Sequence, residues 1–296
     1  MSEARTDPAA TTTNDAAAAP ATDQSGPDSP RSAPPERTMQ GHWLLASLGK
    51  RVLRPGGLAL TRHLLQQAAP HRDDRIVEFG PGVGKTAALL LAVTPTSYVG
   101  VDPNPEGQEA LRAVLDRHPQ ARCEVADAAA TGLPDGQTDL VVGEAMLTMH
   151  SPDGKAAIVA EAARLLAPGG RYAIHELLRV GDEATLACHG DGGPSDPVSK
   201  EISRTIKVGA RPLTLDGWTG LLTDAGLTVE WTEQAPMRLL EPSRVVADEG
   251  LVGAARFMAN VLRNKAARER IAQMRTSFRD NKDSLAAIAI VARKPV

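Results

Sequence analysis

The chain contains 296 residues, which suits one large domain or one domain with an appendage, and its 42% of hydrophobic residues can form a substantial core. Aromatic residues make up only 3% of the chain, so stacking platforms for nucleic-acid bases are not expected. The net charge of −3 comes from residues 1–37, which hold six acids and three bases. The balanced remainder has no basic stripe for a phosphate backbone, which argues against nucleic acid as a partner.

The first segment, residues 1–37, is predicted to be a disordered tail because it holds six prolines, many small polar residues and no apolar periodicity. It has neither the basic start nor the apolar core of a signal peptide. The rest of the chain has no 18-residue apolar run that predicts a membrane span. We therefore expect a cytoplasmic protein with one folded domain over residues 38–296.

Only two cysteines are present, Cys123 and Cys188, which is too few for a disulfide scaffold. Cys188 is followed by His189, but adjacent residues rarely form a metal site unaided. No metal is expected.

Residues 40–69 predict a helical cover of two short helices, over 42–48 and 58–69, with a Pro-Gly-Gly break at 55–57. The leucines of this cover predict packing against a sheet. His42 and Trp43 are left open as contacts of a bound substrate.

The run VEFGPGVGK at residues 77–85 places an acid near the end of an apolar strand, then glycines at 80, 82 and 84, then a helix. Such a turn predicts nucleotide binding, because glycine allows close backbone approach and a helix start offers unpaired N–H groups. A dinucleotide fingerprint would need a third glycine at Lys85, and a phosphate-binding P-loop would need its first glycine at Phe79. Both alternatives fail on this spacing.

Three further strands are predicted at 98–102, 123–128 and 139–144, and each has an acid at or near its end: Asp102, Asp127 and Glu144. Asp102 lies 22 residues after Gly80, the spacing at which a carboxylate meets ribose hydroxyls in a βαβ unit. An L-x-P-G-G step at 166–170 predicts a helix stop, with a fifth strand at 171–175.

The E-x-G-x-G-x-G turn, the acidic strand ends and the L-x-P-G-G step together resemble the class I S-adenosylmethionine-dependent methyltransferases. The resemblance covers residues 74–179 well and the rest in outline. It implies a Rossmann-like α/β fold, with a seven-stranded mostly parallel sheet, helices on both faces and an antiparallel last strand. It also implies S-adenosyl-L-methionine as the cofactor.

By this resemblance, Glu78 should lie near the methionine amino group of the cofactor. Gly80, Gly82 and Gly84 should shape the turn under the methionine and ribose. Asp102 should accept hydrogen bonds from both ribose hydroxyls.

The resemblance also implies that Asp127 meets the adenine amino group, with the backbone N–H of Ala128 at a ring nitrogen. Asp135 and Asp139 are close rivals of Asp127. Glu144 should lie beside the departing methyl group, although a helix cap or a solvated loop position is the alternative for each acid.

Residues 180–212 predict a loop insertion, rich in Gly, Asp and Pro at 189–194, with a short helix at 202–208. Residues 244–283 are predicted to be helical, and the sequence leaves open whether they cap the pocket, form the contact of a homo-oligomer or pack in the core. Residues 285–292 predict the last strand.

The acceptor is the least determined part of the prediction. The [DN]-P-P-[YF] pattern of enzymes that methylate DNA amino groups is absent, since residues 143–146 read GEAM. The candidate general bases are His150, which follows the fourth strand, and His175 and Glu176, which end the fifth, all on the ligand side of the sheet. A satisfied structural residue is the alternative for each histidine. We expect methyl transfer to a small molecule, with a non-catalytic cofactor-binding regulator and an aminopropyl transferase as alternatives.

Overall fold

The computed structural model describes residues 39–50, 54–104, 108–181, 196–237 and 240–296, and the elements below all belong to the compact unit Pro35–Val296. The predicted tail at 1–37, Cys188, and the whole Gly-rich part of the predicted insertion at 189–194 lie outside the described residues.

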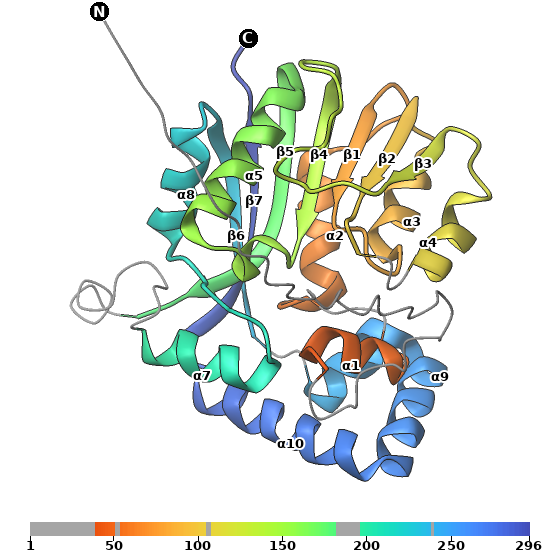
Figure 1. The fold of residues 1–296 in the computed structure, drawn as a ribbon, viewed down its shortest axis with the longest axis vertical. Coiled ribbons are helices and arrows are strands. Elements are labelled where there is room, and N and C mark those ends of the chain that lie inside the picture. The colour runs from red at the N-terminus through yellow and green to blue at the C-terminus, as the bar shows by residue number, and fades with distance from the viewer. Residues whose placement is uncertain (1–38, 51–53, 105–107, 182–195, 238–239) are drawn as a thin grey trace, which may run out of the picture. The chain divides into compact units, whose positions relative to one another are not determined.

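A seven-stranded sheet in the order β3-β2-β1-β4-β5-β7-β6 forms the centre of this unit (Figure 1). The strands β1 to β5 pair in parallel, and β7 lies antiparallel between β5 and β6. This arrangement confirms the predicted fold class. The strands are β1 (Arg75–Phe79), β2 (Ser97–Val101), β3 (Ala121–Glu124), β4 (Thr138–Glu144), β5 (Leu166–Arg179), β6 (Thr228–Pro236) and β7 (Leu285–Arg293).

Helices cover both faces of the sheet. One face packs against α2 (Gly57–Ala68), α3 (Lys85–Leu91) and α4 (Gln108–Leu115) through a core that includes Leu64, Leu90 and Leu111. The other face packs against α5 (Pro152–Leu165) and α8 (Leu215–Asp224), where Trp218 is fully buried. The central strands β1, β2 and β4 are therefore mostly buried, as parallel strands covered on both faces are expected to be, whereas the edge strand β3 is more exposed.

Four more helices gather at one end of the sheet, below it in Figure 1: α1 (Gly41–Ser47), α7 (Pro197–Ile206), α9 (Pro242–Arg263) and α10 (Lys265–Asp280). They share a hydrophobic cluster of their own, with Leu45, Ile202, Phe257 and Met274 among its buried members. The segment expected to be helical at 244–283 forms α9 and α10, and both helices contribute side chains to this cluster.

Several predicted boundaries were wrong for local reasons. The helix predicted at 202–208 begins at Pro197, because Asp196 caps it by accepting from the N–H of Ser199 at 3.1 Å, and it ends before Lys207, which has φ 60°. The strand predicted at 123–128 ends at Glu124, because the Asp127 carboxylate accepts the N–H of Ala129 at 2.8 Å and turns the chain.

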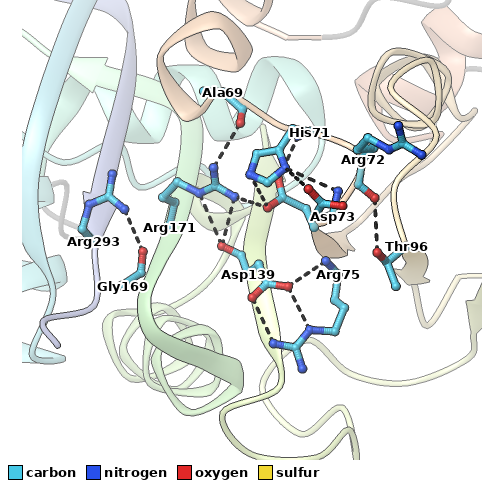
Figure 2. Close-up of polar contacts among 11 residues, drawn as sticks. Ala69, His71, Arg72, Asp73, Arg75, Thr96, Asp139, Gly169, Arg171 and Arg293 are labelled. Carbon is cyan, nitrogen blue, oxygen red and sulfur yellow. Dashed lines mark hydrogen bonds and ion pairs between the residues drawn. The ribbon is translucent and has the colours of Figure 1, made fainter.

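Figure 2 shows the opposite end of the sheet, where the parallel strands begin and β7 ends. Asp139 accepts two hydrogen bonds from the Arg75 guanidinium, at 2.8 and 2.9 Å, and joins the starts of β1 and β4. The Arg171 guanidinium donates to the Asp74 carboxylate at 2.6 Å. This contact connects the start of the pairing between β4 and β5 to the same network. These ion pairs hold the amino-terminal edge of the sheet together.

Candidate functional site

A cavity of about 370 Å³ lies between the carboxyl ends of the strands and the group of four helices. This volume falls within the range of about 300–1,000 Å³ that is usual for small-molecule sites. The residues that line the strand side include Glu78, Gly80, Gly82, Asp102, Asp127, Ala128, Glu144, His150 and Glu176. The structure therefore brings nearly all of the predicted site residues to one cavity; among the described residues, Gly84 and His175 do not line it.

The glycine turn after β1 needs glycine for conformation. Gly80, Gly82 and Gly84 have φ values of 65°, 54° and 77°, which side chains other than glycine rarely adopt. At Gly84 a Cβ would also lie 3.1 Å from Leu111, so this position is crowded from the outside of the turn. Gly80 and Gly82 line the cavity, and a Cβ there would meet Met146 and the Gly80 carbonyl only at ordinary contact distances of 3.7 and 4.0 Å, so these two positions are less crowded than Gly84.

Glu78 is a buried carboxylate at the edge of the cavity. Its Oε2 accepts the hydroxyl of Tyr98 at 2.6 Å, and Arg54 is a nearby positive charge. Burial raises the pKa of Glu78 to about 7 in spite of these two partners. A carboxylate in this state favours a cationic ligand group, such as the ammonium of a methionine moiety.

Asp102 and Asp127 follow β2 and β3 and both line the cavity. Asp102 is half-buried, accepts the N–H of Asn104 at 2.9 Å and lies 3.4 Å from the N–H of Gly82, and burial raises its pKa. The two rivals of Asp127 are engaged elsewhere, because Asp139 pairs with Arg75 and Asp135 pairs with Arg164. The spacing of strand-end acids in the sequence therefore selected the residues that face the cavity.

Glu144 is the centre of a buried polar cluster at the end of β4. Its Oε2 contacts the Arg54 guanidinium and the Thr86 hydroxyl, and its Oε1 accepts the Thr61 hydroxyl at 2.6 Å. His175 Nδ1 lies 2.9 Å from the same Oε1. Glu144 thus joins the loop before α2, the start of α3 and the strand β5 to the cavity wall.

The three candidate bases occupy different environments. His150 lines the cavity, and burial lowers its pKa, so its ring is neutral at pH 7 and can take a proton. His175 is fully buried, with Nε2 facing the carbonyl of Pro55, and burial lowers its pKa to about 3. Its two ring nitrogens are thus directed into the protein interior.

Glu176 lines the cavity but is occupied by the chain itself. Its two oxygens accept the N–H groups of Met146, Leu147 and Thr148 at 2.9, 2.7 and 3.1 Å, and the Thr148 hydroxyl at 2.7 Å. These residues form the loop after β4 and the start of a short 3-10 helix, Leu147–Met149. The carboxylate therefore holds this loop in place beside the cavity.

Sequence reasoning missed Arg54, Thr61 and the hydroxyl of Tyr98 as parts of the site. Arg54 stands in a Pro/Gly-rich break, where no periodic pattern marks a buried cation. Tyr98 lies in an apolar strand and was predicted from its apolar character alone. The two-residue alternation of β2 is the signal that could have found it, since Tyr98 lies on the same face as Gly100, the register partner of Glu78.

The fold, together with the acidic residues at the carboxyl ends of the strands, is typical of a Rossmann-like enzyme that binds a nucleoside-containing cofactor. A family model described as a methyltransferase domain matches residues 76–170. An uncharacterized protein of Haemophilus influenzae is 30% identical over 257 residues, which cover 86% of this chain and 98% of that protein. The 27-O-demethylrifamycin SV methyltransferase of Amycolatopsis mediterranei is 26% identical over 265 residues, which cover 88% of this chain and 90% of that enzyme.

Among solved structures, the geranyl diphosphate C-methyltransferase of Streptomyces coelicolor shares the fold, with a TM-score of 0.57 and 14% identity over 80% of this chain and 77% of that one. The chain belongs to the class I S-adenosylmethionine-dependent methyltransferases, and S-adenosylmethionine is its cofactor. The glycine turn and the buried carboxylate of Glu78 fit this cofactor chemically.

No helix within the described ranges is long and apolar enough to cross a membrane. The same part of the chain contains no group of three His, Cys, Asp or Glu side chains that could hold a metal ion.

Proposed function

We propose that this enzyme methylates a small-molecule acceptor held in the cavity between the strand ends and the four helices. The observation that carries the proposal is the cavity itself, which is of small-molecule size and has the cofactor turn in its wall. The relative from Amycolatopsis mediterranei, named as a methyltransferase of 27-O-demethylrifamycin SV, supports an acceptor of this class. The balanced charge of residues 38–296 supports it over a nucleic acid.

The strand wall would hold the cofactor. Glu78 would pair with the methionine ammonium, and Arg54 is the cation that could meet the methionine carboxylate. Asp102 would accept the ribose hydroxyls, while Asp127 and the N–H of Ala128 would meet the adenine.

The bound cofactor supplies a methyl group that its sulfonium already activates, so the protein mainly positions the acceptor. His150 would take the proton of an acceptor hydroxyl or amine, because it is the candidate base that both lines the cavity and is neutral at pH 7. Glu176 would position the loop that leads to His150. His175 and Glu144 would position the cavity wall from within.

Labelled S-adenosylmethionine tests this proposal. The enzyme is incubated with the methyl-labelled cofactor and an extract of the cells that make it, and the products are separated into low-mass, protein and nucleic-acid fractions. We expect the label in the low-mass fraction, and we expect His150→Ala to lose it while still binding S-adenosylhomocysteine. Label confined to protein or nucleic acid would contradict the small-molecule acceptor.

Calorimetry tests the cofactor residues separately. We expect Asp102→Ala to weaken S-adenosylhomocysteine binding by about 1–3 kcal/mol, because the ribose hydroxyls would be left poorly satisfied. Asp139→Ala is the matched control, since this aspartate lies at the other end of the sheet (Figure 2) and should leave the affinity unchanged.

A further inference from the structure

We propose that the methyl acceptor is an uncharged molecule with an apolar body, and that this body lies against the helical wall of the cavity. This inference rests on the proposed function, because it names the chemical class of the acceptor in the same cavity.

The two walls of the cavity differ in chemistry. The charged and titratable lining residues belong to the strand ends, to the loops beside them and to the start of α3: Arg54, Glu78, Lys85, Asp102, Asp127, Glu144, His150 and Glu176. The helical wall is formed by apolar side chains from α1, α7, α10 and the ends of β5 and β6: Leu45, Leu177, Ile202, Ile206, Met237, Met274 and Phe278. Among the described lining residues, this helical wall carries no acid, lysine, arginine or histidine.

The helical wall is one continuous apolar surface. All seven of its side chains belong to, or pack against, the single hydrophobic cluster shared by the four helices. Met274 and Phe278 are one turn apart on α10 and are 1% and 6% exposed, so the wall is backed by a packed core. The apolar group that lies against Met237 and Met274 can vary in shape, because methionine side chains adapt to irregular apolar groups.

This wall discriminates against charged acceptors. A carboxylate or ammonium placed against it would lose its hydration and gain no hydrogen-bonding partner there. An apolar body would instead gain from leaving water. With its body on this wall, an acceptor would present its nucleophile to the opposite side, where His150 and Thr148 line the cavity.

Three matched probes test the inference by binding alone: 2-naphthol, which is neutral, 2-naphthoate, which is an anion, and 2-naphthylmethylammonium, which is a cation. Each is titrated calorimetrically into the enzyme saturated with S-adenosylhomocysteine at pH 7. We expect 2-naphthol to bind about tenfold or more tightly than either charged probe.

Substitutions in the wall localise the effect. Met274→Lys should weaken 2-naphthol binding by about fivefold or more, and Ile206→Lys, at a half-buried position that tolerates a new side chain more easily, should do the same. Gln273→Lys, exposed on the neighbouring position of α10, is the control and should bind the probe like the wild type. All three variants should keep the affinity for S-adenosylhomocysteine.

The outcomes separate the two proposals. Charged probes that bind as tightly as 2-naphthol, no probe that binds, or lysine variants that bind 2-naphthol unchanged would overturn this inference while leaving methyl transfer in place. A folded wild type that fails to bind S-adenosylhomocysteine would overturn the proposed function, and this inference with it.

Discussion

The strand β4 carries an acid near each end, and each acid pairs with an arginine in a different environment. At the amino end, the side chains of Asp139 and Arg75 are 31% and 41% exposed. At the carboxyl end, the side chains of Glu144 and Arg54 are each 7% exposed. The same pair of chemical groups is therefore solvent-exposed at the amino end of the strand, called the wet end below, and largely desolvated at the carboxyl end, called the dry end.

This difference in exposure distinguishes a structural ion pair from one that belongs to the functional site. A solvent-exposed ion pair stabilises a protein weakly, by about 0–1 kcal/mol, and its two groups keep their charges at little cost. At the amino end of β4, Arg75 lowers the pKa of Asp139. At the dry end, burial lowers the pKa of Arg54 to about 10 and raises that of Glu78 to about 7. Charges held against their desolvation cost at the edge of a cavity are typical of a functional site.

The largest effect should follow from breaking the dry pair. Glu144→Leu leaves the Arg54 guanidinium buried without its carboxylate, and we expect a loss of about 3–5 kcal/mol in the free energy of unfolding, measured in urea at pH 7. The double variant Arg54→Met/Glu144→Leu should recover part of this loss, because it removes both charges together. A single variant within 1 kcal/mol of the wild type would contradict the view that the pair is desolvated.

The acids of this end were predictable from the sequence, whereas their partners were not. Glu78, Asp102, Asp127 and Glu144 lie in the last residues of a strand or shortly after it. The carboxyl ends of parallel strands meet at one edge, so short-range patterns place these acids. The seven-stranded, mostly parallel sheet follows from the same patterns together with the resemblance.

Arg54 could not be placed in this way, because 90 residues separate it from Glu144 and only the tertiary fold joins them. His175 and Glu176 were expected at the end of the fifth strand, but β5 continues to Arg179. A sequence also does not show which face of a strand is covered by a neighbouring segment. The three N–H groups that Glu176 accepts become visible only when the loop after β4 is folded.

The titration of Glu78 sharpens the comparison next. Its pKa is raised in the folded state, so the native protein binds this proton more tightly; the resulting stabilisation is complete below about pH 4.5 and is lost as the pH rises to about 7. Glu78→Gln cannot titrate. In the cofactor-free state, the stability of this variant relative to the wild type should therefore rise by up to about 3 kcal/mol between these pH values.

Urea unfolding at pH 4.5, 6 and 7.5 measures this difference, and a difference that stays flat would contradict the raised pKa. Cofactor binding offers a second readout. If an ammonium pairs with Glu78, the wild-type affinity for S-adenosylmethionine should rise between pH 6 and 8, and that of Glu78→Gln should not.

A smaller effect is expected at Glu176, whose carboxylate accepts four hydrogen bonds. Glu176→Gln turns one accepting oxygen into an amide that faces N–H or O–H donors, which should cost about 1–3 kcal/mol of stability. Hydrogen exchange should quicken at the amides of Leu147 and Thr148. Glu230→Gln is the control, since Glu230 forms an exposed pair with Arg293 and should change neither quantity. Unchanged exchange in the Glu176 variant would show that the loop is held by other contacts.

The smallest effect should come from the wet end of β4. Asp139→Asn keeps the size of the side chain but removes its charge, and we expect a loss of no more than about 1 kcal/mol at pH 7, reduced further in 1 M salt. Because Arg75 lowers the pKa of Asp139, this contribution is present above the unfolded pKa of about 3.9 and fades as the pH falls through the lower folded value. The variant and the wild type should therefore converge in stability once the pH lies below this folded pKa, and their affinities for S-adenosylhomocysteine should match throughout. The pair of Asp139 and Arg75 has no contact with the cavity, so it should not influence the site. A loss above 2 kcal/mol, or a change in cofactor affinity, would therefore mean that the two ends of the strand are energetically coupled.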